Sequence, residues 1–264
     1  MDFELKGKTA LVTGSTAGIG FATAHRLAAE GAKVVITGRT EARVEAAVAR
    51  VRESVSGAEV LGVAVDLSDE AGVDALLAQV PSTDVLVNNL GIFEPVAWDA
   101  LSWKDYTQMF ETNVVSGALL SQKYLAGMFE RGFGSIVFIS SESAQQIPAE
   151  MIHYGVSKAA QAAVARGLAE VTRGTAVRVN TVLAGPTKSE GVIDFVKSLA
   201  EQGGKTVEEV EADFFREARP TSLLQRFTSP EEVADAIAFL CSPRASAITG
   251  AAVRAEGGVV KTVF

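Results

Sequence analysis

The chain has 264 residues, of which 48% are hydrophobic and 21% are charged, and its formal net charge is −8. This length accommodates one large α/β domain with a sizeable core. The acidic balance argues against nucleic acid and against an anionic membrane as the main partner, because both require a basic protein surface.

Two further features narrow the class of protein. The single cysteine, Cys241, permits no intrachain disulfide and no cysteine-based metal site, so we expect no metal. The first residues, M-D-F-E-L-K, lack the basic segment and apolar run of a signal peptide. The sequence contains no run of about 18 apolar residues, so we expect no transmembrane helix. We therefore expect a cytoplasmic protein with no membrane partner.

Short β-rich runs alternate along the chain with longer runs rich in Ala, Leu and Glu. Near-continuous apolar strands that alternate with helices predict a parallel sheet with helices on both faces. We expect strands at residues 9–13, 33–37, 60–65, 84–88, 135–139, 177–182 and 251–255. The sequence has no linker-like tract and no repeat, so we expect a single domain over residues 1–264.

The first predicted strand runs directly into T-G-S-T-A-G-I-G, residues 13–20, and then into a helical pattern. Glycines at 14, 18 and 20 allow a tight turn and close approach of the backbone to a pyrophosphate, which a helix N-terminus also attracts. The spacing G-x-x-x-G-x-G differs from the usual G-x-G-x-x-G, and glycine-rich turns also occur for structural reasons. In the first strand–helix unit of an alternating chain, this turn favours a bound dinucleotide.

The end of the second predicted strand bears on the choice of dinucleotide. A carboxylate there binds the ribose 2′-hydroxyl of NAD, whereas an arginine accommodates the 2′-phosphate of NADP. This chain has Arg39 and Thr40 at that point, with Arg43 one helical turn further on, although Glu41 lies close by. We favour NADP as the cofactor and keep NAD as the alternative.

Asp66 ends the third predicted strand. It is a candidate acceptor for the amino group of adenine. The alternative is an N-cap for the next helix, a role for which Ser68 is at least as suitable.

A long segment separates the strand that ends near Leu183 from the helix that starts near Ser229. It contains two helical patterns, at residues 190–201 and 207–216, with a glycine break between them. A long excursion after the carboxyl end of a strand is where doubly wound folds place the cover of a ligand. We expect residues 188–228 to form a substrate lid, with a plain surface excursion as the alternative.

Tyr154 and Lys158 lie four residues apart in Y-G-V-S-K and therefore about one turn apart on one side of a helix. The opposite side of the helical wheel carries the apolar residues Val156, Ala160, Ala163, Val164, Leu168 and Val171. We therefore expect the pair to face a pocket or a subunit contact, with the apolar side as the core-facing one.

Taken together, these motifs resemble those of the short-chain dehydrogenase/reductase family, over nearly the whole chain. The matching motifs are T-G-S-T-A-G-I-G, Asp66, N-N-L-G at 88–91, Asn113, S-S at 140–141, Y-G-V-S-K and A-G-P-T at 184–187. The resemblance implies a doubly wound Rossmann-type fold with a seven-stranded parallel sheet. It also implies an NAD(P)-dependent oxidoreductase that acts on a carbonyl or secondary alcohol of a small molecule, as a homotetramer or homodimer.

The family assigns four catalytic residues here. Tyr154 would be the general acid/base. Lys158 would lower the pKa of the Tyr154 phenol, because a nearby opposite charge favours the phenolate. Lys158 would also bind the nicotinamide ribose. Ser141 would hold the substrate oxygen, with Ser140 as second choice. Asn113 would hold a water that passes protons to solvent, or be only a polar residue that breaks a helix.

The resemblance also implies a set of residues that bind the cofactor. They are Gly14, Ser15, Thr16, Gly18, Ile19, Gly20, Arg39, Thr40, Asp66, Leu67, Asn89, Gly91, Tyr154, Lys158, Gly185 and Thr187. Two positions depart from the family pattern, since Leu90 replaces an alanine and Ala184 precedes Gly185 where a proline is usual.

The substrate is not specified by the motifs. Phe93, Gln145, His153 and the segment after Thr187 are candidate walls of the pocket. Two other functions remain open at this stage: a dinucleotide-binding regulator without turnover, and a non-redox, lyase-type enzyme on the same scaffold.

Overall fold

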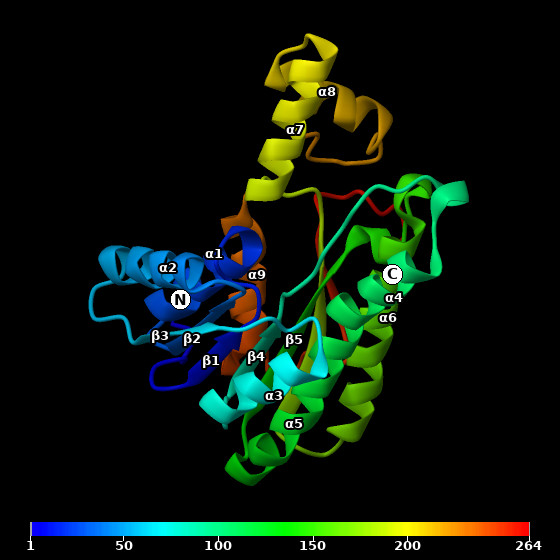
Figure 1. Cartoon of the computed structure of the whole chain (residues 1–264). Coiled ribbons are helices and arrows are strands. Elements are labelled where there is room, and N and C mark those ends of the chain that lie inside the picture. The colour runs from blue at the N-terminus through cyan, green and yellow to red at the C-terminus, as the bar shows by residue number, and fades with distance from the viewer. Residues whose placement is uncertain (1, 264) are drawn as a thin grey trace.

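The computed structural model describes residues 2–263 and is built on a parallel sheet of seven strands (Figure 1). The strands are β1 (Thr9–Val12), β2 (Lys33–Gly38), β3 (Val60–Ala64), β4 (Val85–Asn88), β5 (Gly134–Ser141), β6 (Val177–Ala184) and β7 (Ala252–Ala255). They pair in the order β3-β2-β1-β4-β5-β6-β7. The predicted seven-stranded sheet is confirmed, and β5 and β6 each extend two residues beyond their predicted ends.

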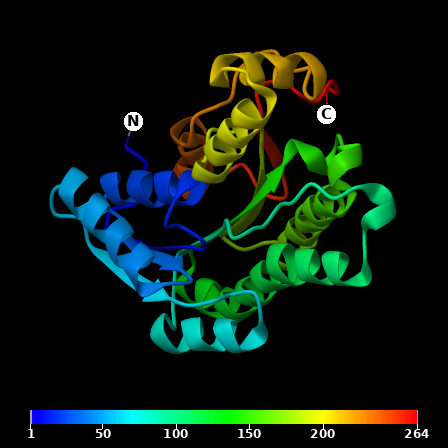
Figure 2. The same cartoon turned by 45° about the horizontal axis from the view of Figure 1, so that its top comes forward.

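Helices cover both faces of the sheet, as Figure 2 shows. One face carries α1 (Gly18–Ala29), α2 (Glu41–Ser54) and α9 (Pro230–Cys241). The other face carries α3 (Glu70–Gln79), α5 (Ser116–Arg131) and α6 (Ile152–Val171), with α4 (Trp103–Phe110) packed against α6. The short helical turns are η1 (Trp98–Ala100), η2 (Glu111–Val115), η3 (Glu142–Ala144), η4 (Ala149–Met151) and η5 (Pro243–Ala245).

The strands divide their side chains between two cores because successive residues of a strand point to opposite faces. In β1, Ala10 and Val12 belong to the core under α1, α2 and α9, whereas Leu11 belongs to the core under α3, α5 and α6. In β5, Val137 belongs to the core under α1, α2 and α9, and Ile136 belongs to the core under α3, α5 and α6. Such strands bury both faces, which explains their near-continuous apolar sequences.

The order of the strands reverses between β1 and β4. The chain leaves β1 toward β2 and β3 on one side and continues from β4 toward β5, β6 and β7 on the other. In open α/β sheets, ligands bind outside the carboxyl ends of the strands at such a switch point. The ends of β1, β4 and β5 therefore locate the candidate site.

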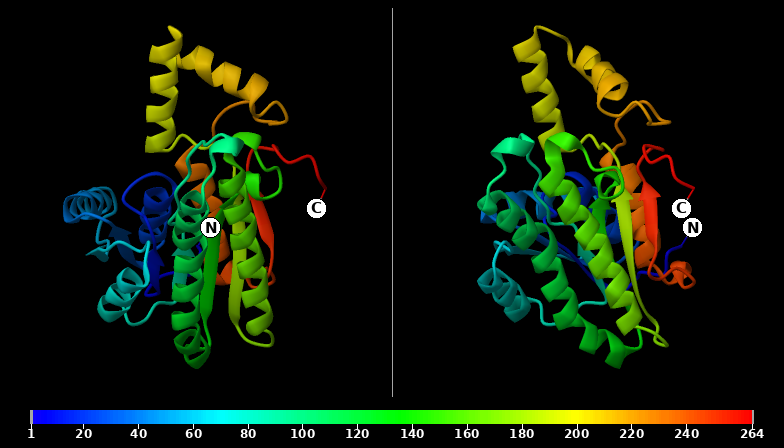
Figure 3. Two further views of the ribbon diagram at one scale, coloured as in Figure 1. Left: turned by 45° about the vertical axis from the view of Figure 1, so that its right-hand side comes forward. Right: turned by 90° about the vertical axis from the view of Figure 1, so that its right-hand side faces the viewer.

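Two helices, α7 (Glu190–Gly203) and α8 (Val207–Glu217), stand above the carboxyl ends of the strands (Figure 1, Figure 3). They enclose a small core of their own, composed of Val196, Ala200, Val210, Phe215 and Phe227. The base of this excursion is closed by a parallel bridge between Thr187 and Thr228, whose hydroxyl oxygens lie 3.0 Å apart. Among the helices of residues 2–263, none combines the length and apolarity needed to cross a membrane.

Candidate active site

The glycine turn links β1 to α1 in the conformation that its sequence predicts. Gly14 and Gly18 have φ angles of 60° and 56°, a left-handed region that residues with a side chain rarely adopt. A Cβ on Gly18 would also lie 3.2 Å from the Cβ of Ser189, at the start of α7. The N-cap of α1, Ala17, supplies no side-chain hydrogen bond, so the first amides of the helix keep their capacity to bind an anion.

Several residues of the predicted cofactor set hold the turn in place. The Asn89 side chain donates to the carbonyls of Thr13 and Gly14, at 2.9 and 3.0 Å, and a Cβ on Gly20 would lie 2.4 Å from its Nδ2. The Ser15 hydroxyl donates to Val12 O and accepts from the Thr37 amide, and the Ser15 amide donates to Thr37 O. Ser15 thus joins β1 to β2 within the turn, and its contact with the cofactor stays a prediction.

Thr16 and Ile19 are half-buried in the same turn. Thr16 packs against Gly38 at the end of β2, where a Cβ would lie 2.5 Å from the Thr16 methyl carbon. Ile19 packs against the core under α1 and α2. Both side chains shape the turn, and Gly38 lets β2 pass close beneath it.

The expected phosphate-binding arginine is well placed to receive an anion. Arg39 is exposed directly after β2, and no ion pair or hydrogen bond of its guanidinium occurs among residues 2–263. Thr40, also exposed, is the N-cap of α2. Arg43, by contrast, pairs with Glu190 of α7 at 2.5 Å.

After β3, the N-cap of the next helix is a different residue from the two predicted candidates, Asp66 and Ser68. Asp66 is exposed, and its Oδ1 accepts from the Ser68 amide at 3.1 Å, but the N-cap of α3 is Asp69, which accepts from the Gly72 amide. Neither Asp66 nor Ser68 is therefore the cap. The Leu67 side chain is buried in the core under α3, which leaves its backbone groups for the predicted cofactor contact.

Lys158 lies beneath the loop that follows β4. It is 5% exposed, and its Nζ donates to Ile139 O at 2.9 Å. A Cβ on Gly91 would lie 3.2 Å from this Nζ and 3.4 Å from Oδ1 of Asn113. Gly91 thus lets the loop after β4 pass close to the Lys158 amine and the Asn113 amide, where a side chain would crowd both groups.

Asn113 occupies a π-helical turn, η2, between α4 and α5. Its Nδ2 donates to Ile92 O and to Ser157 Oγ, both at 3.0 Å, and its Oδ1 accepts from the Ile92 amide at 2.8 Å. The side chain therefore fastens the loop after β4 to α6. π-Helical turns are rare and occur frequently at functional sites, which argues against a mere polar filler.

Tyr154 is half-buried on the first turn of α6, and Phe93 meets its ring edge-on at 6.3 Å. Burial and the nearby Glu142 carboxylate raise the pKa of the phenol above its ordinary value of 10, while Ser141 and Arg219 act in the opposite direction. Burial lowers the pKa of Lys158 to about 7. Its Nζ lies 5.6 Å from the Tyr154 ring centre. In this structure burial has the largest effect on the phenol pKa, and the expectation that Lys158 lowers it stays a prediction.

The two serines at the end of β5 have distinct partners. Ser140 donates to the carbonyl of Lys158 at 2.8 Å and is 2% exposed, so it supports α6. The Ser141 hydroxyl donates to the Glu142 carboxylate and accepts from the Ser143 amide at 3.1 Å. Of the pair, Ser141 is the one beside Tyr154, and its role as the substrate-binding serine stays a prediction.

Sequence reasoning missed a buried ion pair next to Ser141. Arg219, in the segment after α8, places its Nε 2.9 Å from Oε1 of Glu142, and the side chains are 9% and 5% exposed. An acidic residue directly after a buried strand was a visible signal for Glu142. No local pattern marks Arg219, because its position depends on how the excursion folds back.

The predicted orientation of α6 is only partly right. Tyr154 and Lys158 do share a face, but this face is the buried one, together with Ser157, Gln161 and Ala165. The predicted core stripe is half-buried at best, and Ala163 and Val171 are exposed. The reason is that α6 must approach β5 closely for Lys158 to reach Ile139 O.

The remaining predicted positions lie around the same crevice. Leu90 is half-buried against the core under α3 and α5, so its larger side chain packs inward. Gly185 allows close approach of Glu256, because a Cβ on Gly185 would lie only 2.6 Å from the Cα of Glu256. The Thr187 hydroxyl donates to Gly185 O and is 5% exposed.

Of the candidate walls, Phe93 packs edge-on against the Tyr154 ring. His153 is 1% exposed and packs edge-on against Tyr106 of α4, which corrects its prediction as a wall of the pocket. Gln145 is exposed, and the neighbouring Gln146 lines a cavity instead.

Comparisons with known proteins agree with this geometry. A family model described as enoyl-(acyl carrier protein) reductase matches residues 14–260. The uncharacterized oxidoreductase YvaG of Bacillus subtilis is 46% identical over 264 residues, which is 100% of both chains. A 3-oxoacyl-[acyl-carrier-protein] reductase of Aquifex aeolicus is 32% identical over 98% of this chain and 100% of its own.

A solved structure shows the same architecture throughout. L-sorbose reductase from Gluconobacter frateurii, complexed with NADPH and L-sorbose, superposes with a TM-score of 0.94 at 32% identity over 100% of both chains. The fold, the family match and these relatives lead to one conclusion. The chain belongs to the short-chain dehydrogenase/reductase family and is an NAD(P)-dependent oxidoreductase that acts on CH–OH or C=O groups.

Proposed function

We propose that the protein is an NADP-dependent reductase of a small carbonyl compound, with Tyr154 as its proton donor. The observation that carries this proposal is the convergence of Tyr154, Ser141 and Lys158 at the carboxyl end of β5, where Gly91 lets the loop after β4 pass close to the Lys158 Nζ. A phenol whose pKa is raised stays protonated at neutral pH, and a protonated acid supports reduction of a carbonyl rather than oxidation of an alcohol.

Each residue has a defined task in this reaction. The reduced dinucleotide, when bound, supplies a hydride to the carbonyl carbon. Tyr154 donates its phenolic proton to the carbonyl oxygen, and Ser141 orients that oxygen, so the carbonyl gains one hydride and one proton and leaves as an alcohol. Lys158 binds the ribose and passes a proton back to Tyr154 from solvent. Asn113 keeps the loop after β4 and α6 in register and is proposed to hold the water of this relay.

The choice of NADP rests on Arg39. Its guanidinium is exposed at the end of β2, whereas Arg43 is engaged with Glu190. Replacing Arg39 by Ala should weaken NADPH binding roughly 10- to 100-fold and NADH binding little, because a hydrogen-bonded charge pair is lost only with the 2′-phosphate. Calorimetric titration of both cofactors measures this. Equal weakening of the two would remove the argument for NADP.

Three further expectations belong to the proposal. Residues 188–228 cover the substrate as a lid on a single-domain chain, supported by the position of α7 and α8 above the strand ends. The protein assembles as a homotetramer or homodimer, supported by exposed apolar side chains on α6 and α5, such as Val171 at 62% and Phe129 at 37%. It acts in the cytoplasm.

The relatives leave the substrate class open, since one is a reductase of L-sorbose and another is a 3-oxoacyl-[acyl-carrier-protein] reductase. The enzymatic proposal itself is tested with a panel of ketones while nicotinamide absorbance is followed. Consumption of NADPH that depends on an added ketone supports it. A protein that binds NADPH but reduces no member of a broad panel would point to a regulator or to non-redox chemistry.

A further inference from the structure

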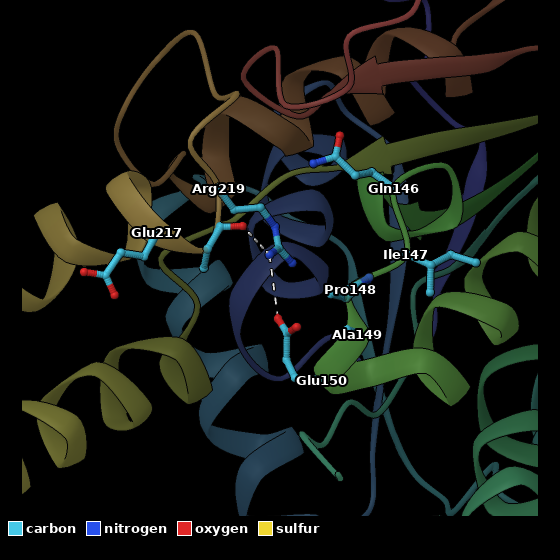
Figure 4. A pocket seen from close by; sticks show the side chains of 8 residues that line it. Gln146, Ile147, Pro148, Ala149, Glu150, Glu217 and Arg219 are labelled. Carbon is cyan, nitrogen blue, oxygen red and sulfur yellow. Dashed lines mark hydrogen bonds and ion pairs between the residues drawn. The ribbon is translucent and has the colours of Figure 1, made fainter. Parts of the chain in front are cut away.

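A cavity of about 460 Å³ opens between the loop that follows β5 and the end of α8 (Figure 4). It is lined by residues 146–150 on one side and 217–219 on the other. The first group lies on the segment that connects Ser141 to Tyr154, and the second lies in the proposed lid. The cavity is therefore bounded by the two parts of the chain that can surround a substrate.

Two side chains connect this cavity to the catalytic serine. Arg219 lines the cavity and binds Glu142 through its Nε at 2.9 Å. Glu142 accepts the hydrogen bond of Ser141. A molecule in contact with Arg219 is thus two hydrogen-bonded side chains away from the hydroxyl that is proposed to orient the reacting oxygen.

The charge around the cavity disfavours an anionic substrate. Arg219 is shared between Glu142 and Glu150, whose nearest oxygen lies 3.8 Å from its Nη1. One guanidinium between two carboxylates leaves an excess of one negative charge, and the Glu142–Arg219 pair is buried, where charges are weakly screened. A substrate carboxylate or phosphate would add a third anion to a single cation.

Glu217 does not change the charge balance between Arg219 and the two carboxylates of Glu142 and Glu150. Its side chain is 70% exposed, pairs with Arg216 at 2.9 Å, and points away from Arg219 in Figure 4. The same view shows Gln146 and Glu150 on the other wall, with Glu150 joined to Arg219.

The wall chemistry also disfavours an apolar substrate and a cationic one. An apolar molecule would remove water from Gln146, Glu150 and Arg219 without replacing its hydrogen bonds, which is unfavourable. A cation would lie next to the Arg219 guanidinium. A hydroxyl group donates to Glu150 and accepts from Arg219 or Gln146 while it adds no charge. Ile147, Pro148, Ala149 and Ala218 supply the apolar part of the lining, which can contact the carbon-bound hydrogens of such a molecule.

We propose that this cavity recognises a neutral polyhydroxylated carbonyl compound, of the ketose class, and that Arg219 and Glu150 determine this specificity. The inference rests on the carbonyl-reductase function proposed above. It goes beyond that function by naming the substrate class and the two residues that select it.

Four ketones of equal carbon number test the proposal: erythrulose, 2-butanone, acetoacetate and 1-amino-2-butanone. The expected kcat/KM of the NADPH-loaded enzyme for erythrulose exceeds that for each of the others by roughly tenfold or more, the effect of one hydrogen bond to a charged group. Preference for acetoacetate, for the amine or for 2-butanone would overturn the substrate class and leave the carbonyl-reductase function standing. Loss of all four activities would instead count against that function.

A binding measurement separates recognition from turnover. The NADPH-loaded Tyr154→Phe protein is titrated calorimetrically with erythrulose. In this background, Glu150→Gln and Arg219→Lys should each weaken erythrulose binding roughly 10-fold, while the Kd of NADPH stays unchanged and reports a folded protein.

Two matched variants serve as controls. Glu130→Gln makes the same chemical change as Glu150→Gln on an exposed side chain of α5 outside the cavity, and Arg226→Lys changes an arginine whose exposed pair is with Glu232. Both should leave erythrulose binding within about twofold, since exposed charges and exposed ion pairs contribute little. Equal losses in Glu130→Gln and Glu150→Gln would overturn the assignment of Glu150, and an unchanged affinity in Arg219→Lys would overturn that of Arg219.

Discussion

Replacing Lys158 by Met tests how much the burial of a charged lysine in the candidate active site lowers the free energy of unfolding. Lys158 is 5% exposed, and burial lowers its pKa from 10.5 to about 7. The folded protein therefore binds fewer protons than the unfolded chain between these two values, so the free energy of unfolding rises with pH across this window. The cost of burying the lysine is fully present below pH 7 and disappears near pH 10.5. At pH 7 it amounts to roughly 4 kcal/mol.

Methionine has a similar length and no charge, so Lys158→Met should be more stable than the wild type at pH 7. The gain is about 3 kcal/mol, because the variant also loses the hydrogen bond to Ile139 O, worth about 1 kcal/mol. The gain should shrink by about 1.4 kcal/mol per pH unit above neutrality. Urea unfolding at pH 7 and pH 9, followed by tryptophan fluorescence at one protein concentration, measures both quantities.

Lys123→Met on α5 is the matched control, since Lys123 is exposed and its replacement should change stability by less than about 0.5 kcal/mol at either pH. A stability difference between Lys158→Met and wild type that is the same at pH 7 and pH 9 would refute the reasoning. It would mean that Lys158 does not titrate in this window, and that its positive charge is retained at the site.

Three other predictions follow from the same contacts. Alcohol oxidation should accelerate with rising pH above neutrality, whereas carbonyl reduction should not, because the raised pKa of Tyr154 keeps the phenol protonated; parallel pH–rate profiles would contradict this. Gly18→Ala should weaken NADPH binding roughly 10-fold through left-handed strain and crowding against Ser189, while Gly167→Ala, which meets open space on α6, should not. Light scattering should report a dimer or tetramer that Val171→Asp weakens, and a monomeric wild type would exclude assembly.

The sheet and its helices could be predicted from the sequence because each signal is local. Apolar strands of four to eight residues alternate with helical patterns, and Gly14 and Gly18 of the first turn have positive φ angles. Tyr154 and Lys158 could be paired for the same reason, since their spacing is a property of one helix. These features depend on residues that are near each other in the chain.

The contacts that sequence reasoning missed join segments that are far apart. Arg219 reaches Glu142 across 77 residues, and Asn89 fastens the glycine turn across 76. The orientation of α6 was mispredicted because the wheel counts apolar residues, whereas the helix turns its polar face inward to bring Lys158 to Ile139 O. Tertiary hydrogen bonds outweighed the apolar pattern there.

The most direct test of the central claim is a single-turnover measurement on Tyr154→Phe. Protein loaded with NADPH is mixed with excess ketone, and the loss of reduced-nicotinamide absorbance is followed in the wild type and in the variant. We predict equal affinity for NADPH and a rate that is roughly 10²- to 10⁴-fold lower in the variant, since only the proton donor is removed. Equal rates in the two proteins would contradict the assignment of Tyr154 as the general acid.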